Sequence, residues 1–335
     1  MPDEYDPAIS TDTIRLHRLV REIAAARREA AAREKLRSTL IEALAIVFPQ
    51  DVFDDPKTWP RVRRLDAVAL ALVGSASEPP AGTERSTSGL LSRLASYRHA
   101  ALAAYEQARP LYARALAICE EARGPEHPDT ATSLNNLATL LEAQGDLDAA
   151  LQLFERALTI REKAFGADHP ITAVSLGNLG RLLVTQGELL RTEGRSGRAL
   201  FKRARSLLER TLTIHERETG PRHRDTGVSL TNLALLHEYQ GDLAVALALF
   251  ERALGISETS NGPEHPDTAN ALFNVARVLW TQGCLLRGHG QSHAARPLFE
   301  RAWRLFKRAL SILEKALGPD HPHTVDVRRY LQGLD

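Results

Sequence analysis

The sequence predicts an all-α protein, a right-handed α-solenoid in which helix hairpins stack one on the next. Three observations predict this fold. A seven-residue phrase recurs five times at spacings typical of a solenoid repeat. The residues between two phrases carry apolar side chains at helical spacing. Helix-forming alanine, leucine, arginine and glutamate are abundant, whereas aromatic residues make up only 5% of the chain.

The recurring phrase reads GPEHPDT at Gly124 and again at Gly262, with close variants at Gly166, Gly220 and Gly318. Successive glycines lie 42, 54, 42 and 56 residues apart, so short repeats alternate with long ones. The glycine suits the end of one helix, and the proline suits the first turn of the next. The phrase therefore predicts the corner between two repeats. Its histidines are expected to cap and pack at that corner: His127, His169, His223, His265 and His321.

Each repeat is predicted to be a helical hairpin. In the first full repeat, Leu134, Leu137 and Leu141 share one helix face, Gly145 breaks the pattern, and Phe154 belongs to a second apolar face. Small residues recur on the first helix, and large residues recur on the second, which predicts close interlocking. The small set is Ala138, Gly180, Ala234 and Ala276, and the large set is Phe154, Leu208, Phe250 and Phe306.

The two long repeats are expected to form longer hairpins. A seven-residue step such as LFERAWR–LFKRALS extends the second helix without turning its apolar face far. The first helix would then continue past Gly187 and Gly283, and the turns would fall at residues 194–197 and 288–292. The resulting tips are basic, which is typical of a solvated face and also suits an acidic partner or a neighbouring subunit. The tip arginines are Arg191, Arg195, Arg198, Arg287 and Arg296.

Outside the full repeats, residues 1–73 are predicted to form a helical cap region, with a helix over 11–48. The polar, Pro- and Gly-rich stretch 74–89 is predicted to be a linker. The solenoid is expected over 90–335. We divide it into a degenerate repeat 90–123, full repeats 124–165, 166–219, 220–261 and 262–317, and a capping helix 318–335.

This pattern of small residue, Gly turn, Ala and Phe resembles tetratricopeptide (TPR) repeats, and HPDTA…LNNLA…QGDL…LFERALTI resembles the kinesin-light-chain type. The segments TIRLHRLVRE, DPKTWPRVRRL and ARPLYARALAI also resemble the join between an NB-ARC (STAND) NTPase and its TPR tail. In that family IRLHRLV closes a winged-helix domain. The chain has no GxxxxGK[ST] phosphate loop, so a strand at 14–20 would lack partners and we expect helix there.

Composition and motifs argue against several functions. The net charge is +1, which argues against nucleic acid and membrane as partners. No stretch reaches the roughly 18 apolar residues of a spanning helix, the start MPDEYDPAIS is not a secretory signal, and Cys119 and Cys284 lie far apart. We therefore expect a cytoplasmic protein. Catalytic and zinc motifs are lacking, and a zinc site at Cys284, His289 and His293 is disfavoured. Neither enzyme activity nor a cofactor is expected.

The remaining expectation is binding along the concave surface, which the first helices line. An asparagine recurs there in every full repeat, and its amide suits a peptide backbone; the TPR resemblance implies that role. The alternative is a hydrogen bond that fixes the packing of two helices. The proposed groove residues are Asn136, Asn178, Asn232, Asn274, Arg181, Arg277, Glu142, Glu238, Tyr239 and Trp280.

These arginines and aromatic residues suit a peptide with an acidic and a bulky apolar residue. The kinesin-light-chain resemblance implies short aromatic-acidic motifs. The predicted function is a noncatalytic scaffold for protein partners, with self-association left open. Two alternatives remain: a detached regulatory tail of a STAND NTPase system, and a binder of acidic partners or nucleic acid through the basic tips.

Overall fold

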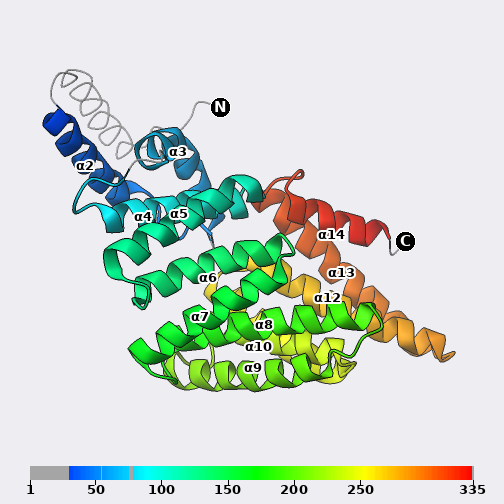
Figure 1. Ribbon diagram of the computed structural model, residues 1–335. Helices are drawn as coiled ribbons and strands as arrows, with labels where there is room; N and C mark the ends of the chain where they lie inside the picture. Colours follow the sequence, from blue (N-terminus) through cyan, green and yellow to red (C-terminus); the bar gives the residue numbers. More distant parts are fainter. Residues whose placement is uncertain (1–29, 54, 75–77, 334–335) are drawn as a thin grey trace, which may run out of the picture. The chain divides into compact units, whose positions relative to one another are not determined.

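A computed structural model describes residues 30–53, 55–74 and 78–333. Within these residues the regular structure is entirely helical, with 13 α-helices and one short 3-10 turn (Figure 1). The chain divides into two compact units, Met1–Asn136 and Leu137–Asp335, and each is described by itself. The division falls inside helix α6 (Pro128–Ala143), so Asn136 is the last residue of the first unit.

The first unit is built around the hairpin of α4 (Glu84–Ala100) and α5 (Tyr105–Arg123). Helices α2 (Ala30–Val47) and α3 (Trp59–Val73) pack against α4, and the 3-10 turn η1 (Pro56–Thr58) precedes α3. Arg93 of α4 donates to the carbonyls of Ala45 and Phe48 at 3.1 and 2.9 Å. These bonds satisfy carbonyls at the end of α2 that have no partner inside that helix.

The linker predicted over 74–89 is wrong at its C-terminal end, because α4 already begins at Glu84. The stretch ERSTSG is polar enough to read as a loop, yet Thr87 and Ser88 are buried helical residues. The Ser88 hydroxyl donates to the Arg85 carbonyl at 3.1 Å, so the helix itself satisfies this polar group. Of the helix predicted over 11–48, residues 11–29 lie outside the described part, and α2 is the rest.

The second unit is a stack of hairpins. The helices are α7 (Leu147–Phe165), α8 (Pro170–Thr192), α9 (Arg198–Glu218), α10 (Arg224–Tyr239), α11 (Leu243–Ser260), α12 (Pro266–Gly288), α13 (Ser292–Ala316) and α14 (Pro322–Gln332). The hairpins α8–α9 and α12–α13 are longer than α10–α11, and their turns fall at 193–197 and 289–291. These helix boundaries match the long hairpins expected from the sequence.

The identity of the residue that follows each Gln-Gly pair differs between the short and the long hairpins. Gly145 and Gly241 have φ of 83° and 87°, and each is followed by an aspartate. The Asp146 carboxylate accepts from the Ala149 N–H and so caps α7, whereas the Asp242 carboxylate makes no capping bond and lies 3.2 Å from His237 Nδ1. At Gly187 and Gly283 the next residue is glutamate or cysteine, which caps a helix poorly, and the first helix continues.

The recurring phrase forms the corner between repeats, as predicted. At all five corners a histidine Nδ1 accepts from the backbone N–H two residues later, at 3.1–3.2 Å. The threonine three residues after each of the first four histidines donates to the carbonyl of the phrase's glycine, at 2.7–2.8 Å. That glycine has a positive φ at every corner, a conformation that other residues adopt at a cost. The five histidines are therefore helix caps.

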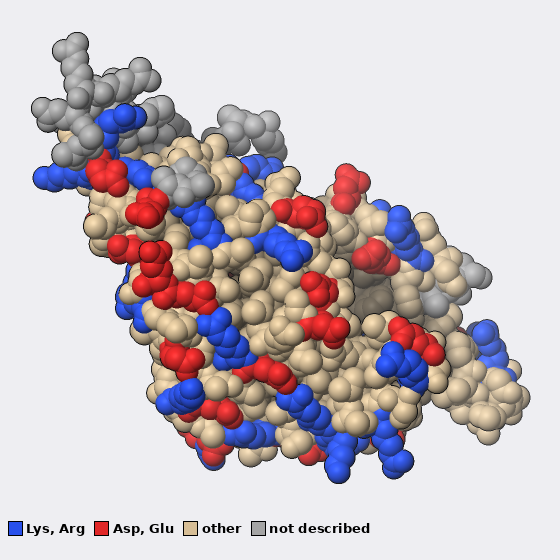
Figure 2. Space-filling view, viewed as in Figure 1, with Lys and Arg blue, Asp and Glu red and all other residues tan. Residues whose placement is uncertain are grey.

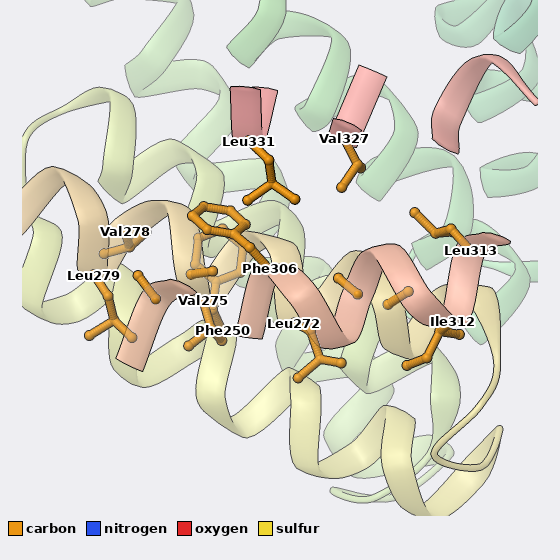
Figure 3. Close-up of a cluster of buried hydrophobic side chains, with 14 of the residues drawn as sticks. Phe250, Leu272, Val275, Val278, Leu279, Phe306, Ile312, Leu313, Val327 and Leu331 are labelled. Atoms are coloured by element: carbon orange, nitrogen blue, oxygen red, sulfur yellow. The ribbon is translucent and has the colours of Figure 1, made fainter. Parts of the chain in front are cut away.

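The core of the second unit follows the predicted alternation of small and large residues. Figure 3 shows Phe250 of α11 and Phe306 of α13 among Leu272, Val275 and Leu279 of α12. All five are buried. At the small-residue site of α8, a Cβ added to Gly180 would lie 2.7 Å from the Leu208 side chain. The small residue thus lets two helices approach closely.

The first unit is expected to lose stability in mild acid because of His99. Its ring packs against Phe53 and Tyr105, and its Nδ1 is buried with no hydrogen-bond partner in the described chain. Burial lowers the pKa of His99 from 6.5 to about 4. The folded state therefore favours the neutral ring, so stability is complete above pH 6.5 and falls as the pH drops toward 4, with a loss of about 2 kcal/mol at pH 5.

Urea unfolding at pH 7 and pH 5, followed by Trp59 fluorescence in a Trp280→Phe, Trp303→Phe background, measures this loss. The His99→Phe variant should show a smaller decrease between the two pH values, because phenylalanine does not titrate. An equal decrease in both proteins would mean that other groups cause the acid sensitivity.

Candidate peptide-binding surface

The recurrent asparagines occupy equivalent positions on the first helix of each repeat. Asn178, Asn232 and Asn274 all lie eight residues beyond the first residue of α8, α10 and α12, and Asn136 lies at the same point of α6. The first three belong to the second unit, and α8 packs against α10. Because Asn136 belongs to the first unit, it is considered separately.

Asn232 is 6% exposed, and its amide has no hydrogen-bond partner among the described residues. Its Nδ2 lies against α8, 3.9 Å from where a Cβ on Gly177 would stand. Asn136 is half-buried and also lacks a partner within the described part of the chain. The Asn274 side chain accepts only a long bond, 3.4 Å, from Arg277. The amide of Asn232 therefore does not link two helices, and its donors and acceptor are unused.

Exposed valines stand one helical turn before two of these amides. Val174 is 39% exposed and Val228 is 52% exposed, four residues before Asn178 and Asn232 respectively. Residues four apart lie on the same helix face. We call the surface formed by Val174, Asn178, Val228 and Asn232 the amide face. It combines apolar area with amide groups on two neighbouring helices.

The two groove arginines form ion pairs with the protein's own carboxylates. Arg181 of α8 makes a bidentate pair with Glu142 of α6, with 2.7 Å between Nη2 and Oε2. The equivalent Arg277 of α12 donates to Glu238 of α10 at 2.6 Å. In both pairs the glutamate comes 39 residues before the arginine. This recurrent spacing in the sequence could have revealed the pairing.

Both glutamates are mostly buried, with side chains 8% and 9% exposed. Burial raises the pKa of Glu142 and of Glu238, and the attraction to Arg181 and Arg277 opposes this rise. The arginines are therefore partly neutralised before any ligand arrives. This placement weakens the expectation that these arginines favour a peptide with an acidic residue.

The two aromatic groove residues pack against their own unit. Tyr239 is half-buried against the core formed by α8 and α9, and burial raises its pKa. The Trp280 ring lies 4.7 Å from the Phe299 ring of α13, measured between centroids.

The tip arginines are mostly engaged with neighbours. Arg191 pairs with Glu188 at 2.7 Å, Arg195 with Glu193 at 3.2 Å and Arg296 with Glu300 at 2.9 Å. Arg287 lies over the Phe299 ring, and Arg198 is exposed with no carboxylate partner in the described chain. On the face shown in Figure 2, basic and acidic side chains alternate over α7 and α9. This distribution is typical of a solvated surface.

Among the described residues, no three His, Cys, Asp or Glu side chains gather closely enough to hold a metal ion. No helix in that part of the chain is both long and apolar enough to span a membrane. Cys284, His289 and His293 thus form no metal-binding group there.

Comparisons with known proteins agree with this architecture. Two tetratricopeptide-repeat family models match the chain, one over 86–163, 140–190, 197–259 and 239–283, and the other over 290–323. Tetratricopeptide repeat protein 19, mitochondrial, from Rattus norvegicus and from Mus musculus, is 48% identical over 44 residues. That match covers 13% of this chain and 12% of those relatives.

Solved structures are similar at lower identity. A Rap protein complexed with Competence and Sporulation Factor has a TM-score of 0.56 at 12% identity, covering 97% of this chain and 87% of that one. BtubC (BKLC) from P. vanneervenii has a TM-score of 0.48 at 22% identity, covering 86% and 90%. A putative kinesin light chain from Podosopora anserina has a TM-score of 0.42 at 21% identity, covering 74% and 95%. Since the first family model alone matches more than half of the sequence, the chain belongs to the tetratricopeptide-repeat family.

Proposed function

We propose that this protein is a noncatalytic scaffold that binds an extended segment of a protein partner along the amide face. The supporting observation is the amide of Asn232, which is nearly buried and has no partner among the described residues. An amide that offers a donor and an acceptor can hold the backbone of a bound peptide whatever its side chains.

The chemistry of the neighbouring residues suggests which peptide binds. Val174 and Val228 offer exposed apolar area beside the amides, so an aliphatic or aromatic side chain is favoured there. Arg181 and Arg277 already hold Glu142 and Glu238. A ligand carboxylate would therefore have to compete with an internal one, and we propose that apolar side chains and backbone contacts contribute more to binding than an acidic residue does.

Site-specific photocrosslinking tests this proposal in the intact chain. A photoreactive phenylalanine analogue at Val228 should capture a partner, whereas the same analogue at Val245 of α11 should not. Val245 is a matched control because it is a valine of similar exposure, 46%, on a second helix. Capture at position 228 should fall about tenfold or more in the Asn232→Ala variant, since the contact of this amide with the peptide backbone would be lost.

Thermal unfolding of the Asn232→Ala variant provides the control for folding. We expect it to melt near the parent protein, because the Asn232 amide makes no hydrogen bond to lose within the described chain. Capture that is equal at Val228 and Val245, or that survives the Asn232→Ala substitution, would contradict the proposal. A large loss of stability would instead assign the asparagines to repeat packing.

A further inference from the structure

A second site, separate from the amide face, lies at the corner between α11 and α12. Asn261 is the residue that ends α11, and Gly262 is the first residue of the recurring phrase. Together they form the only Asn-Gly pair in the sequence. Glycine has no Cβ, so its backbone nitrogen can approach the preceding asparagine amide with little steric hindrance. At the other corners the residue before the glycine carries no amide: Arg123, Phe165, Thr219 and Leu317.

The chemistry that this pair can undergo is deamidation. The Gly262 nitrogen attacks Cγ of Asn261, the new C–N bond closes a cyclic succinimide, and the bond from Cγ to Nδ2 breaks. The proton of the Gly262 N–H leaves with Nδ2 as ammonia. Water then opens the ring at either carbonyl and gives aspartate or isoaspartate. In isoaspartate the backbone continues through the former side-chain carbonyl, so the backbone gains one methylene group.

The peptide unit between Asn261 and Gly262 can rotate toward this reaction. The ψ of Asn261 is −21°, so the unit must turn before its nitrogen faces Cγ. Within the described chain neither its carbonyl nor its N–H forms a hydrogen bond, and the turn therefore breaks none. At three other corners a helix carbonyl holds the glycine N–H at 3.0 Å: Glu120 holds Gly124, Glu162 holds Gly166 and His215 holds Gly220.

Polar neighbours surround the side-chain amide of Asn261. The Ser260 hydroxyl donates to Oδ1, with 3.3 Å between the two oxygens. Negative charge develops on Oδ1 as the ring closes, so a donor at this atom favours the reaction. Nδ2, which leaves as ammonia, donates to the Asp267 carboxylate at 3.1 Å. The reaction would therefore remove a hydrogen bond between the end of α11 and the first turn of α12.

We propose that Asn261 deamidates spontaneously in the folded protein and that the product weakens the corner between α11 and α12. A carboxylate at position 261 would face Asp267 where the amide now donates to it, and the like charges repel. Arg224 donates to the same Asp267 oxygen at 3.2 Å, which offsets only part of this repulsion. Isoaspartate would also lengthen the backbone beside Gly262, whose carbonyl accepts from the Thr268 hydroxyl at 2.7 Å.

This site does not depend on the amide face, since the two share no residue. The proposed change is a covalent modification of the chain, whereas the amide face concerns a bound partner. Either proposal can therefore fail without the other.

Mass spectrometry of the aged, intact chain measures the reaction. After several weeks at pH 8 the protein is digested with trypsin, and the peptide 253–277 is sequenced by fragmentation. This peptide also contains Asn270 and Asn274, which precede alanine and valine and act as internal controls. The readout is the mass increase that accompanies replacement of NH2 by OH. We expect it to accumulate at least about tenfold faster at Asn261 than at either control.

Substitutions test the role of the neighbours. Ser260→Ala removes the donor to Oδ1 and should slow deamidation about threefold. Thr259→Ala is the matched control, because the Thr259 hydroxyl bonds only to helix carbonyls, and it should change the rate less than about twofold.

Thermal unfolding tests the effect on the corner. Asn261→Asp represents one product and should melt about 2–4 °C below the parent protein. Asn261→Thr, which introduces the residue found at the equivalent Thr219, should melt near the parent and should not age at this position.

Three outcomes would overturn the proposal. One is a rate at Asn261 no greater than at Asn270. Another is a rate more than about tenfold below that of an unstructured synthetic peptide spanning 257–265, which would show that the fold protects the amide. The third is equal melting of Asn261→Asp and the parent protein. Equal effects of Ser260→Ala and Thr259→Ala would overturn the part assigned to Ser260.

Discussion

Replacing Phe250 with alanine is expected to lower the free energy of unfolding of the second unit by about 3–5 kcal/mol. The ring is 1% exposed and lies in the core shared by α11, α12 and α13. Alanine would remove buried apolar area and leave a cavity, since Leu272 and Val275 of α12 and Phe306 of α13 are held in place by their own packing and cannot all close in. Urea unfolding in a Trp59→Phe background, with Trp280 and Trp303 as reporters, measures the change.

The control for this prediction is Val245→Ala on the same helix. Val245 is 46% exposed, so its replacement should cost less than about 0.5 kcal/mol. Comparable losses in the two variants would show that α11 is not held mainly by this core. A loss below about 2 kcal/mol for Phe250→Ala would mean that the repeats on either side can collapse into the cavity.

Replacing Arg181 with methionine is expected to destabilise the second unit by about 1–3 kcal/mol at pH 7. The substitution leaves the Glu142 carboxylate, whose side chain is only 8% exposed, without its bidentate partner. Burial already raises the pKa of Glu142, and removing the arginine raises it further. The folded state then binds more protons than the unfolded state, so the deficit should shrink as the pH falls toward 4.5.

A double-mutant cycle separates this effect from the loss of the arginine itself. Glu142→Gln combined with Arg181→Met should be more stable at pH 7 than Arg181→Met alone, because no charge remains buried. The surface pair Arg203–Glu155, whose side chains are 50% and 43% exposed, provides the control, and Arg203→Met should cost less than about 1 kcal/mol. A deficit in Arg181→Met that does not vary with pH would show that Glu142 is hydrated in the folded protein.

Much of the fold could be predicted because the residues that determine it lie close together in the sequence. The motifs that determine the repeats each span only a few consecutive residues. They are the Gly-Pro-His-Pro corners, the Gln-Gly-Asp turns and the seven-residue step before Leu208 and Phe306. The structure confirms the helical repeats, the long hairpins and the histidine caps. The prediction failed at Glu84, where polar residues are buried in a helix. The NB-ARC resemblance depends in part on TIRLHRLVRE, which lies outside the described residues, so the regulatory-tail alternative stays a prediction.

The candidate site was predictable only in part. The equivalence of Asn136, Asn178, Asn232 and Asn274 follows from the repeat alone. Whether an asparagine amide forms a hydrogen bond within the protein depends on its neighbours in other helices. The exposure of Val174 and Val228 depends on those neighbours too. The packing of Trp280 against Phe299 also needed the structure, since the sequence alone is equally compatible with Trp280 as a groove residue.

The sequence by itself determined the repeat register, the alternation of short and long hairpins and the positions of the caps, because these depend on residues adjacent in the chain. Only the tertiary structure decided which charges meet. Glu142 and Arg181 are 39 residues apart, and an ion pair forms only when two side chains come within about 4 Å. That distance is set by how one helix packs on the next, and it determines whether an arginine is available to a ligand.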